Sequence, residues 1–174
     1  MRLSLIGLLA FSLLVSSSAA TVSAADKPKV DKAAVERTRK QVRMLDDIYK
    51  TAVVLITTHY VEEETDLSAG SAAKALFSAI KEKGWHDARL IDATGNPYND
   101  ENVAKDEFEK QAIEKLKNGE SYVDEVVVKD GKPYLRAATI VPVVMQKCTL
   151  CHPHYEQAKK GAAIGAIGYT LPIE

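Results

Sequence analysis

The chain has little of several residue types that support common protein functions. Among its 174 residues are only two cysteines, three methionines and one tryptophan. Two cysteines can form at most one disulfide, so the sequence excludes a disulfide-rich scaffold. Neither charge sign prevails, because 23 Lys and Arg side chains oppose 24 Asp and Glu side chains. This balance, without a basic patch interleaved with aromatic residues, argues against binding to nucleic acid.

Sequence patterns of common enzymes are also absent. The chain contains no G-x-S-x-G, no H-E-x-x-H and no glycine-rich loop that could hold a phosphate group. Its carboxylates are spread along the faces of predicted helices, where contact with water is the usual arrangement. We therefore expect a protein that is not an enzyme.

A long apolar run occurs only at the N-terminus. Arg2 is followed by an apolar run from Leu3 to Val15 and then by small residues that end in Val22-Ser23-Ala24. This layout is typical of a cleaved secretory signal, and the run is shorter than the roughly 20 residues that cross a bilayer. We expect residues 1–25 to be a signal peptide and 26–35 a polar spacer. The mature protein should be periplasmic or otherwise exported, without stable membrane insertion.

Both cysteines belong to one short motif, Cys148-Thr149-Leu150-Cys151-His152. Two thiols at this spacing, followed at once by a histidine, are the attachment signature of haem c. Each thiol can add to a vinyl group of the porphyrin, and the imidazole that follows can bind the iron. The motif predicts one covalent haem c per chain, attached through Cys148 and Cys151, with His152 as an iron ligand.

Two alternatives to haem remain open from the residues alone. In an exported protein Cys148 and Cys151 could form a disulfide or act as a haem-free redox pair. A zinc ion could bind the same thiols with His152 and His154. Structural zinc sites usually take their ligands from two separated pairs, so this compact cluster is a poor match. The histidine directly after the second cysteine favours haem over both alternatives.

The second axial ligand of the iron decides between electron transfer and the binding of a small molecule. His59 is the first candidate for this metal-binding role, because it falls on the apolar stripe predicted for the first long helix. An open or water-filled position is an alternative to a protein ligand. The weaker candidates are Met44, His86, Met145 and His154.

The haem should also meet basic and apolar side chains. Arg136 is the expected cofactor-binding partner of the propionates, with Arg89 beside it, because a guanidinium group can bind both oxygens of a carboxylate. An ordinary ion pair on a strand is the alternative for both arginines. The residues expected to pack around the porphyrin are Leu55, Leu76, Ile140 and Val143, with Tyr49 or Tyr169 at a polar edge.

Residue periodicity predicts an α+β domain over residues 36–174. Apolar residues at spacings of three and four predict helices over 36–60, 69–83 and 106–117. In the first helix the predicted buried stripe is Val42, Leu45, Ile48, Ala52, Ile56 and His59. Asp130-Gly131 between two apolar runs predicts a hairpin of 121–129 and 132–144. With further strands at 88–93 and 163–173, we expect an antiparallel sheet with a long N-terminal helix and inserted helices.

The order of these parts resembles a family of exported haem c-binding domains with a PAS-like fold, first catalogued as a domain of unknown function. The resemblance extends over about residues 45–173. The similar stretches are residues 49–57 (YKTAVVLIT), Gly84-Trp85, Leu135-Arg136-Ala137-Ala138 with Pro142, and residues 148–153. Small class I cytochromes c differ, because they carry the motif early and place a methionine after it, whereas no methionine follows His152.

The resemblance implies a haem that senses redox state or a small ligand. Some members of the family are fused to chemoreceptors or histidine kinases, and in them the haem domain is the expected sensor. No signalling domain is recognisable in this chain, so a sensor would need a separate partner. The resemblance thus implies haem as cofactor and a small gas or a redox partner protein as partner. A soluble c-type electron-transfer protein is the alternative function.

Overall fold

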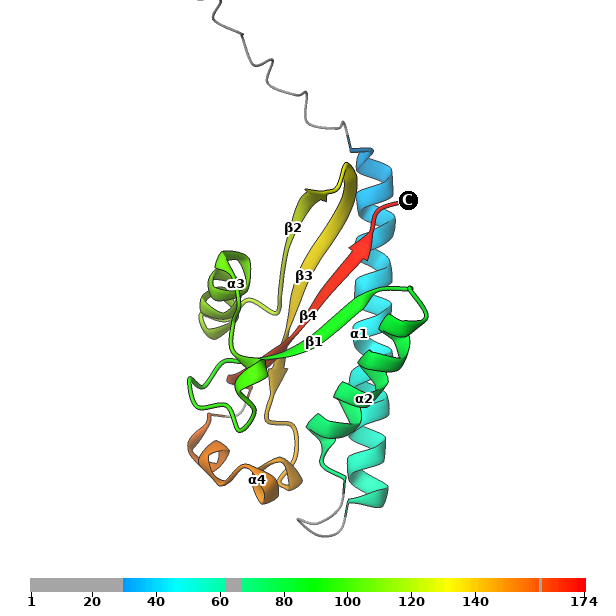
Figure 1. The fold of residues 1–174 in the computed structure, drawn as a ribbon. Coiled ribbons are helices and arrows are strands. Elements are labelled where there is room, and N and C mark those ends of the chain that lie inside the picture. The colour runs from blue at the N-terminus through cyan, green and yellow to red at the C-terminus, as the bar shows by residue number, and fades with distance from the viewer. Residues whose placement is uncertain (1–29, 62–66, 160) are drawn as a thin grey trace, which may run out of the picture.

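The fold is an antiparallel sheet with helices on both faces. The computed structural model describes residues 30–61, 67–159 and 161–174. The sheet has the order β1-β4-β3-β2, and all neighbouring strands are antiparallel. The long first helix lies along one face of this sheet (Figure 1). The expected α+β class, antiparallel sheet and N-terminal helix are therefore confirmed. The strands are β1 (Asp87–Asp92), β2 (Tyr122–Lys129), β3 (Lys132–Pro142) and β4 (Ala163–Pro172).

Helix α1 (Lys32–Tyr60) begins four residues before the predicted start. The carboxylate of Asp31 caps it by accepting hydrogen bonds from the backbone N–H groups of Ala33 and Ala34, at 3.1 and 3.2 Å. Such a cap satisfies donors that have no partner within the helix. The last residues of the predicted spacer are therefore helical. The predicted signal peptide and the first part of the spacer lie outside the described residues.

The buried stripe of α1 differs from the predicted one in its second half. Val42 is fully buried, but Ile48, Ile56 and His59 are exposed. The inward positions are instead Tyr49, Val53 and Thr57, which are buried or half-buried. Steps of seven and then four from Val42 follow the period of 3.6 residues per turn, whereas repeated steps of three drift to one side. The predicted stripe is wrong for this half of the helix.

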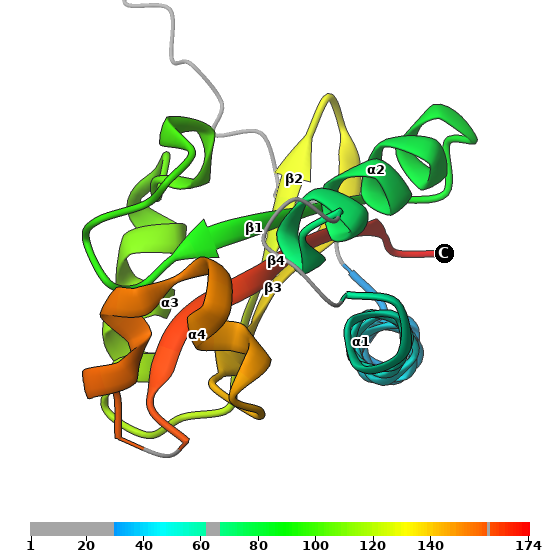
Figure 2. The same cartoon turned by 90° about the horizontal axis from the view of Figure 1, so that it is seen from below.

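Two further helices are capped by side chains and cover opposite faces of the sheet. Ser68 caps α2 (Ala69–Glu82), and Asp106 caps α3 (Glu107–Lys117). Helices α1 and α2 pack on one face and α3 on the other (Figure 2). Alternation along each strand separates the two cores, so that Leu135 and Ala137 face α1 while Ala138 faces α3.

The predicted hairpin is confirmed, and the C-terminal strand lies in the middle of the sheet. Asp130 and Gly131 both have positive φ, 52° and 75°, as a two-residue turn between antiparallel strands requires. Strand β4 pairs with both β1 and β3. After Pro142 the chain leaves the sheet for α4 (Lys147–Cys151) and the short 3-10 helix η2 (Pro153–Gln157), while η1 (Asp100–Asn102) precedes α3. Within the described ranges no helix is both long and apolar enough to cross a membrane.

Candidate functional site

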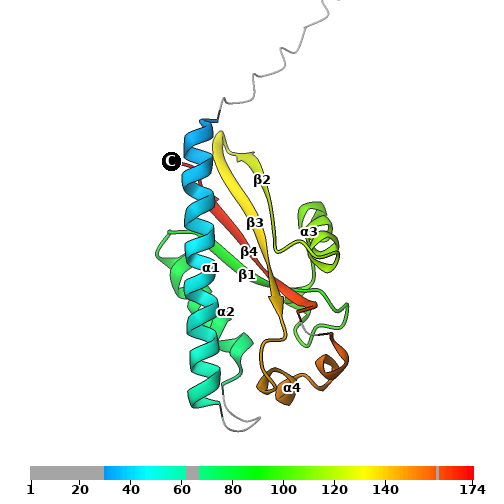
Figure 3. The same ribbon diagram turned by 180° about the vertical axis from the view of Figure 1, so that it is seen from behind.

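The Cys148–His152 motif lies at one end of the sheet, beside the C-terminal end of α1 (Figure 3). Lys147, directly before the first cysteine, attaches the motif to the end of α1. Its ammonium group donates hydrogen bonds to the carbonyl oxygens of Thr58 and Val61, at 3.1 and 2.6 Å. The last carbonyls of a helix have no partner within the helix, so a lysine at this end is stabilising. This contact fixes the start of the motif against α1.

A cavity of about 540 Å³ lies between the motif, helices α1 and α2, and the end of the sheet. This volume is typical of sites for small molecules and cofactors. Cys148 and His152 both line the cavity. Most of its walls are apolar, and they include Val53, Val54, Phe77, Leu90, Ile164 and Ile167. The only two-cysteine motif of the sequence therefore forms part of the wall of an apolar cavity.

Cys148 is half-buried and carries a free thiol. The side chain of Cys151 lies outside what the structure describes, but its backbone belongs to the same helical turn of α4 as Cys148. Residues three apart on a helix lie on one side of it. In the described part of the chain, no three His, Cys, Asp or Glu side chains form a cluster that could hold a metal ion.

The imidazole of His152 packs against two tyrosine rings. The centroid of the Tyr98 ring lies 4.7 Å from that of His152, and the centroid of Tyr155 lies 4.6 Å from it. Burial lowers the pKa of His152 below its usual range, and the neighbouring His154 lowers it further. The imidazole is therefore neutral at pH 7, which is the form that binds metals.

The Nδ1 atom of His152 is buried and has no hydrogen-bond partner among the described residues. A free thiol, a neutral imidazole and apolar walls are the groups that haem c needs. The side chains present at this site therefore fit haem c.

His59 does not lie in this cavity. It is exposed in the last turn of α1, while α1 contributes Tyr49, Val53 and Thr57 to the wall. The expectation that His59 shares the buried face is wrong, for the reason given for the helix stripe. Of the weaker candidates, Met145 lines the cavity, whereas Met44 is exposed and His86 is hydrogen-bonded to Tyr49.

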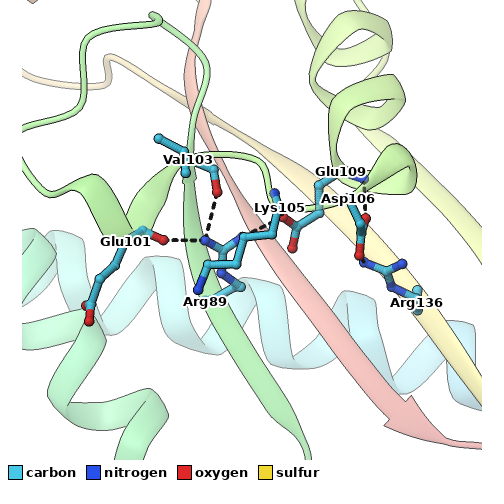
Figure 4. Close-up of polar contacts among 7 residues, drawn as sticks. All are labelled: Arg89, Glu101, Val103, Lys105, Asp106, Glu109 and Arg136. Atoms are coloured by element: carbon cyan, nitrogen blue, oxygen red, sulfur yellow. Dashed lines mark hydrogen bonds and ion pairs between the residues drawn. The ribbon is translucent and has the colours of Figure 1, made fainter.

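Arg136 and Arg89 are on the opposite face of the sheet from α1. Arg136 lies between Leu135 and Ala137, which both face α1, so its side chain must point towards α3. There it forms an ion pair with Asp106, at 2.7 Å. Arg89 forms an ion pair with Glu109, at 2.6 Å (Figure 4). The structure thus corrects the expected surroundings of both arginines and shows the ion pairs that were their alternative.

Basic side chains do reach the cavity, but they are lysines of α1 and α2. Lys50 lines the wall and forms an ion pair with Asp46 at 2.8 Å. Lys74 lines it near the start of α2 and forms an ion pair with Glu101 at 2.7 Å. Sequence reasoning missed both lysines and Tyr98, because no motif marks them.

The apolar lining differs from the expected one. Tyr49 lines the cavity as expected. Leu55 is 52% exposed, because it lies on the outer side of α1. The remaining expected residues do not belong to the lining, and they are Leu76, Ile140, Val143 and Tyr169.

Comparison with known families matches residues 19–170 to the family described as Tll0287-like. The match includes β1 to β3, most of β4, the cavity and the two-cysteine motif. No curated protein matches the chain.

Proposed function

Because the chain belongs to the Tll0287-like family, we propose that it is an exported protein with a PAS-like domain that carries one haem c. Cys148 and Cys151 form the thioether links, and His152 is an iron ligand. When bound, haem c supplies an iron that can change its oxidation state or take a small ligand. The proposed role is to sense redox state or a small ligand, and it is not an enzymatic one.

One observation supports this proposal above all. The first cysteine and the histidine of the motif line the same apolar cavity of about 540 Å³. A disulfide or a thiol redox pair needs no such cavity, whereas a porphyrin must remove its large apolar faces from water. The lining also includes Lys50 and Lys74, and an ammonium group has three N–H donors, so each lysine can bind a propionate while it keeps its ion pair. In this proposal they take the place of the arginines.

A sensing role is supported by the state of the other potential iron ligands. Lys50 and Lys74 are each held in an ion pair, and the Tyr49 hydroxyl is hydrogen-bonded to His86. Recruiting any of them to iron would break an existing contact. This favours an iron with a position free for a small gas, and a separate partner protein that reads the change.

Electron transfer is the second candidate, and it is favoured by Met145. This methionine lines the cavity, and a thioether opposite histidine is the ligand pair of electron-transfer cytochromes c. The two roles differ in what happens on exposure of the reduced protein to carbon monoxide. A sensor binds it and its Soret band shifts, whereas a carrier with two protein ligands does not respond. In a carrier, Met145→Leu creates the response.

The haem itself is tested by producing the full chain with the export and haem-attachment machinery. We expect the intact mass of the purified protein to exceed that of the mature polypeptide by one haem, with a haem c spectrum in alkaline pyridine. The double variant Cys148→Ala/Cys151→Ala should lose the added mass. A parent protein with the mass of the bare polypeptide overturns the proposal. A disulfide between its two thiols then supports the haem-free redox pair.

A further inference from the structure

The ring of His152 packs against two tyrosine rings from separate parts of the fold. Tyr155 comes from η2, and its ring is nearly parallel to that of His152, with an interplanar angle of 17°. Tyr98 comes from the loop that follows β1, and its ring is tilted by 30°. Stacked or offset arrangements at these distances are favourable. The imidazole therefore lies in an aromatic cluster, which also includes the His154 ring, 5.6 Å away between ring centroids.

The loop that carries Tyr98 is held in place by Asp92, the last residue of β1. One carboxylate oxygen of Asp92 accepts a hydrogen bond from the Thr94 hydroxyl at 2.8 Å, and the other accepts one from the Gly95 N–H at 2.6 Å. Gly95 has a φ of 81°, which suits the tight turn. Tyr98 is thereby presented to a motif far away in the sequence.

Tyr155 is fixed by the backbone of the motif itself. Its N–H donates a hydrogen bond to the carbonyl oxygen of His152 at 2.9 Å, within the turn that begins η2. Pro153 follows His152 directly and stiffens the same turn. The two tyrosines thus have independent supports, one in the loop after β1 and one in η2.

A histidine that binds a metal usually donates its second N–H to an acceptor, and this bond sets the orientation of the ring. Here Nδ1 of His152 is buried without a partner among the described residues. Contact with the tyrosine rings is therefore what orients the imidazole. Water at Nδ1 would accept its proton and make the imidazole a stronger donor to iron.

We propose that Tyr98 and Tyr155 are positioning residues that clamp the His152 ring and shield its Nδ1 from water. The inference rests on the proposed haem. The clamp keeps the imidazole a weak donor, so it holds the reduction potential of the haem higher than an exposed histidine would. The aromatic rings act here, and their hydroxyl groups do not.

The test uses the holoprotein, with the midpoint potential measured by spectroelectrochemistry. Tyr98→Ala should lower the potential, because the opened face admits water, and Tyr98→Phe should keep the parent value. Tyr98 is 65% exposed on its loop, so the alanine variant should fold. Tyr155→Leu and Tyr155→Phe repeat the comparison at the second tyrosine. The matched control is Tyr60→Ala, a tyrosine that is 77% exposed and outside the cavity lining.

A second experiment measures how fast the Nδ1 proton of His152 exchanges with solvent. Its NMR signal is resolved because the nearby haem shifts it away from the other signals. In Tyr98→Ala this proton should exchange with D₂O faster than in the parent, and in Tyr98→Phe at the parent rate. The clamp is overturned if the alanine variant keeps the parent potential and exchange rate, or if the phenylalanine variant changes as much as the alanine variant. A parent protein without haem instead sinks the proposed function, so the two failures are distinguishable.

Discussion

The phenol oxygen of Tyr49 lies 2.8 Å from Nε2 of His86, and this hydrogen bond joins the wall of the cavity to the loop before β1. Burial raises the pKa of the Tyr49 hydroxyl and lowers the pKa of the His86 imidazole. The nearby Asp87 carboxylate opposes the second effect, but burial is the larger cause. Both groups are therefore neutral at pH 7 in the folded protein.

This pair predicts a loss of stability in mild acid. The unfolded chain takes up a proton at His86 near its ordinary pKa of about 6.5, whereas the folded chain does so only at lower pH. Between these two values the unfolded state binds more protons, so the free energy of unfolding falls as the pH falls. The contribution is fully present above about pH 6.5 and is lost as the pH drops through the folded pKa.

His86→Gln tests this pH dependence, because glutamine cannot titrate and still offers Tyr49 an acceptor. Denaturant unfolding at about pH 7.5 and about pH 5.5 brackets the ordinary histidine pKa. The loss of unfolding free energy between these values should be smaller in His86→Gln than in the parent. Other histidines titrate in both proteins and cancel in the comparison. Equal losses in the two proteins would show that His86 does not carry the effect.

His86 also shows what a sequence can and cannot indicate. The helices and strands were predicted to within a few residues, because capping residues and the Asp130-Gly131 turn act locally. The hydrogen bond from Tyr49 to His86 joins positions 37 apart, and no local pattern encodes it. The same holds for the contact of Tyr98 with His152. Long-range contacts of single side chains therefore required the structure.

His59→Ala is expected to leave the haem spectrum unchanged in both oxidation states. His59 is exposed and is not among the residues that line the cavity, so it lies outside the proposed haem site. Absorption spectra of the oxidised and reduced proteins measure this directly. His152→Ala is the matched comparison, because it removes the proposed iron ligand and should change both spectra. A shifted spectrum in His59→Ala would indicate that His59 is an iron ligand after all.

The misplaced residues have simple geometric causes. Side chains alternate between the two faces along a strand. Because its neighbours Leu135 and Ala137 face α1, Arg136 faces the other side of the sheet, where it meets Asp106. Along a helix of 29 residues, a small error in the assumed period rotates the predicted stripe away from the buried one. The error is smallest near Val42 and largest at His59. The motif residues are adjacent in the sequence, so neither error affects their relation, and Cys148 and His152 line the same cavity.

The ion pair of Arg89 and Glu109 should contribute more to stability than the surface ion pairs of this protein. Glu109 is only 6% exposed, and its carboxylate accepts hydrogen bonds from Arg89 at 2.6 Å and from the Lys105 N–H at 2.7 Å (Figure 4). Removing one partner of a buried pair leaves an uncompensated charge. Glu109→Ala should lower the unfolding free energy by about 2–4 kcal/mol, since the Arg89 side chain keeps partial contact with water.

Lys81→Ala is the control for this ion pair. Lys81 forms an ion pair with Asp87 at 3.0 Å, but both side chains are more than half exposed. Exposed pairs contribute little, so the change should stay within about 0.5 kcal/mol in denaturant unfolding. Similar losses in Glu109→Ala and Lys81→Ala would contradict the importance of burial here.

Strands β1 and β4 approach each other so closely at Gly165 that this position needs a glycine. Strand β4 runs through Gly165 without interruption. A Cβ atom at Gly165 would lie 2.8 Å from the carbonyl oxygen of Ile91, a backbone atom that cannot move without disturbing the sheet. Gly165→Ala should therefore lower the unfolding free energy by about 1–3 kcal/mol, the usual cost of overpacking.

Gly70→Ala separates this close approach from a general effect of glycine replacement. Gly70 lines the same cavity from the first turn of α2, and a Cβ atom there would lie 3.7 Å from the nearest atom, in the Leu90 side chain. That distance is ordinary contact, and alanine favours a helix over glycine by up to about 1 kcal/mol. Thermal unfolding should therefore show a lower midpoint for Gly165→Ala and an equal or higher midpoint for Gly70→Ala. If both midpoints fall together, the two glycines share a need for space in the cavity, and the strand contact is not the cause.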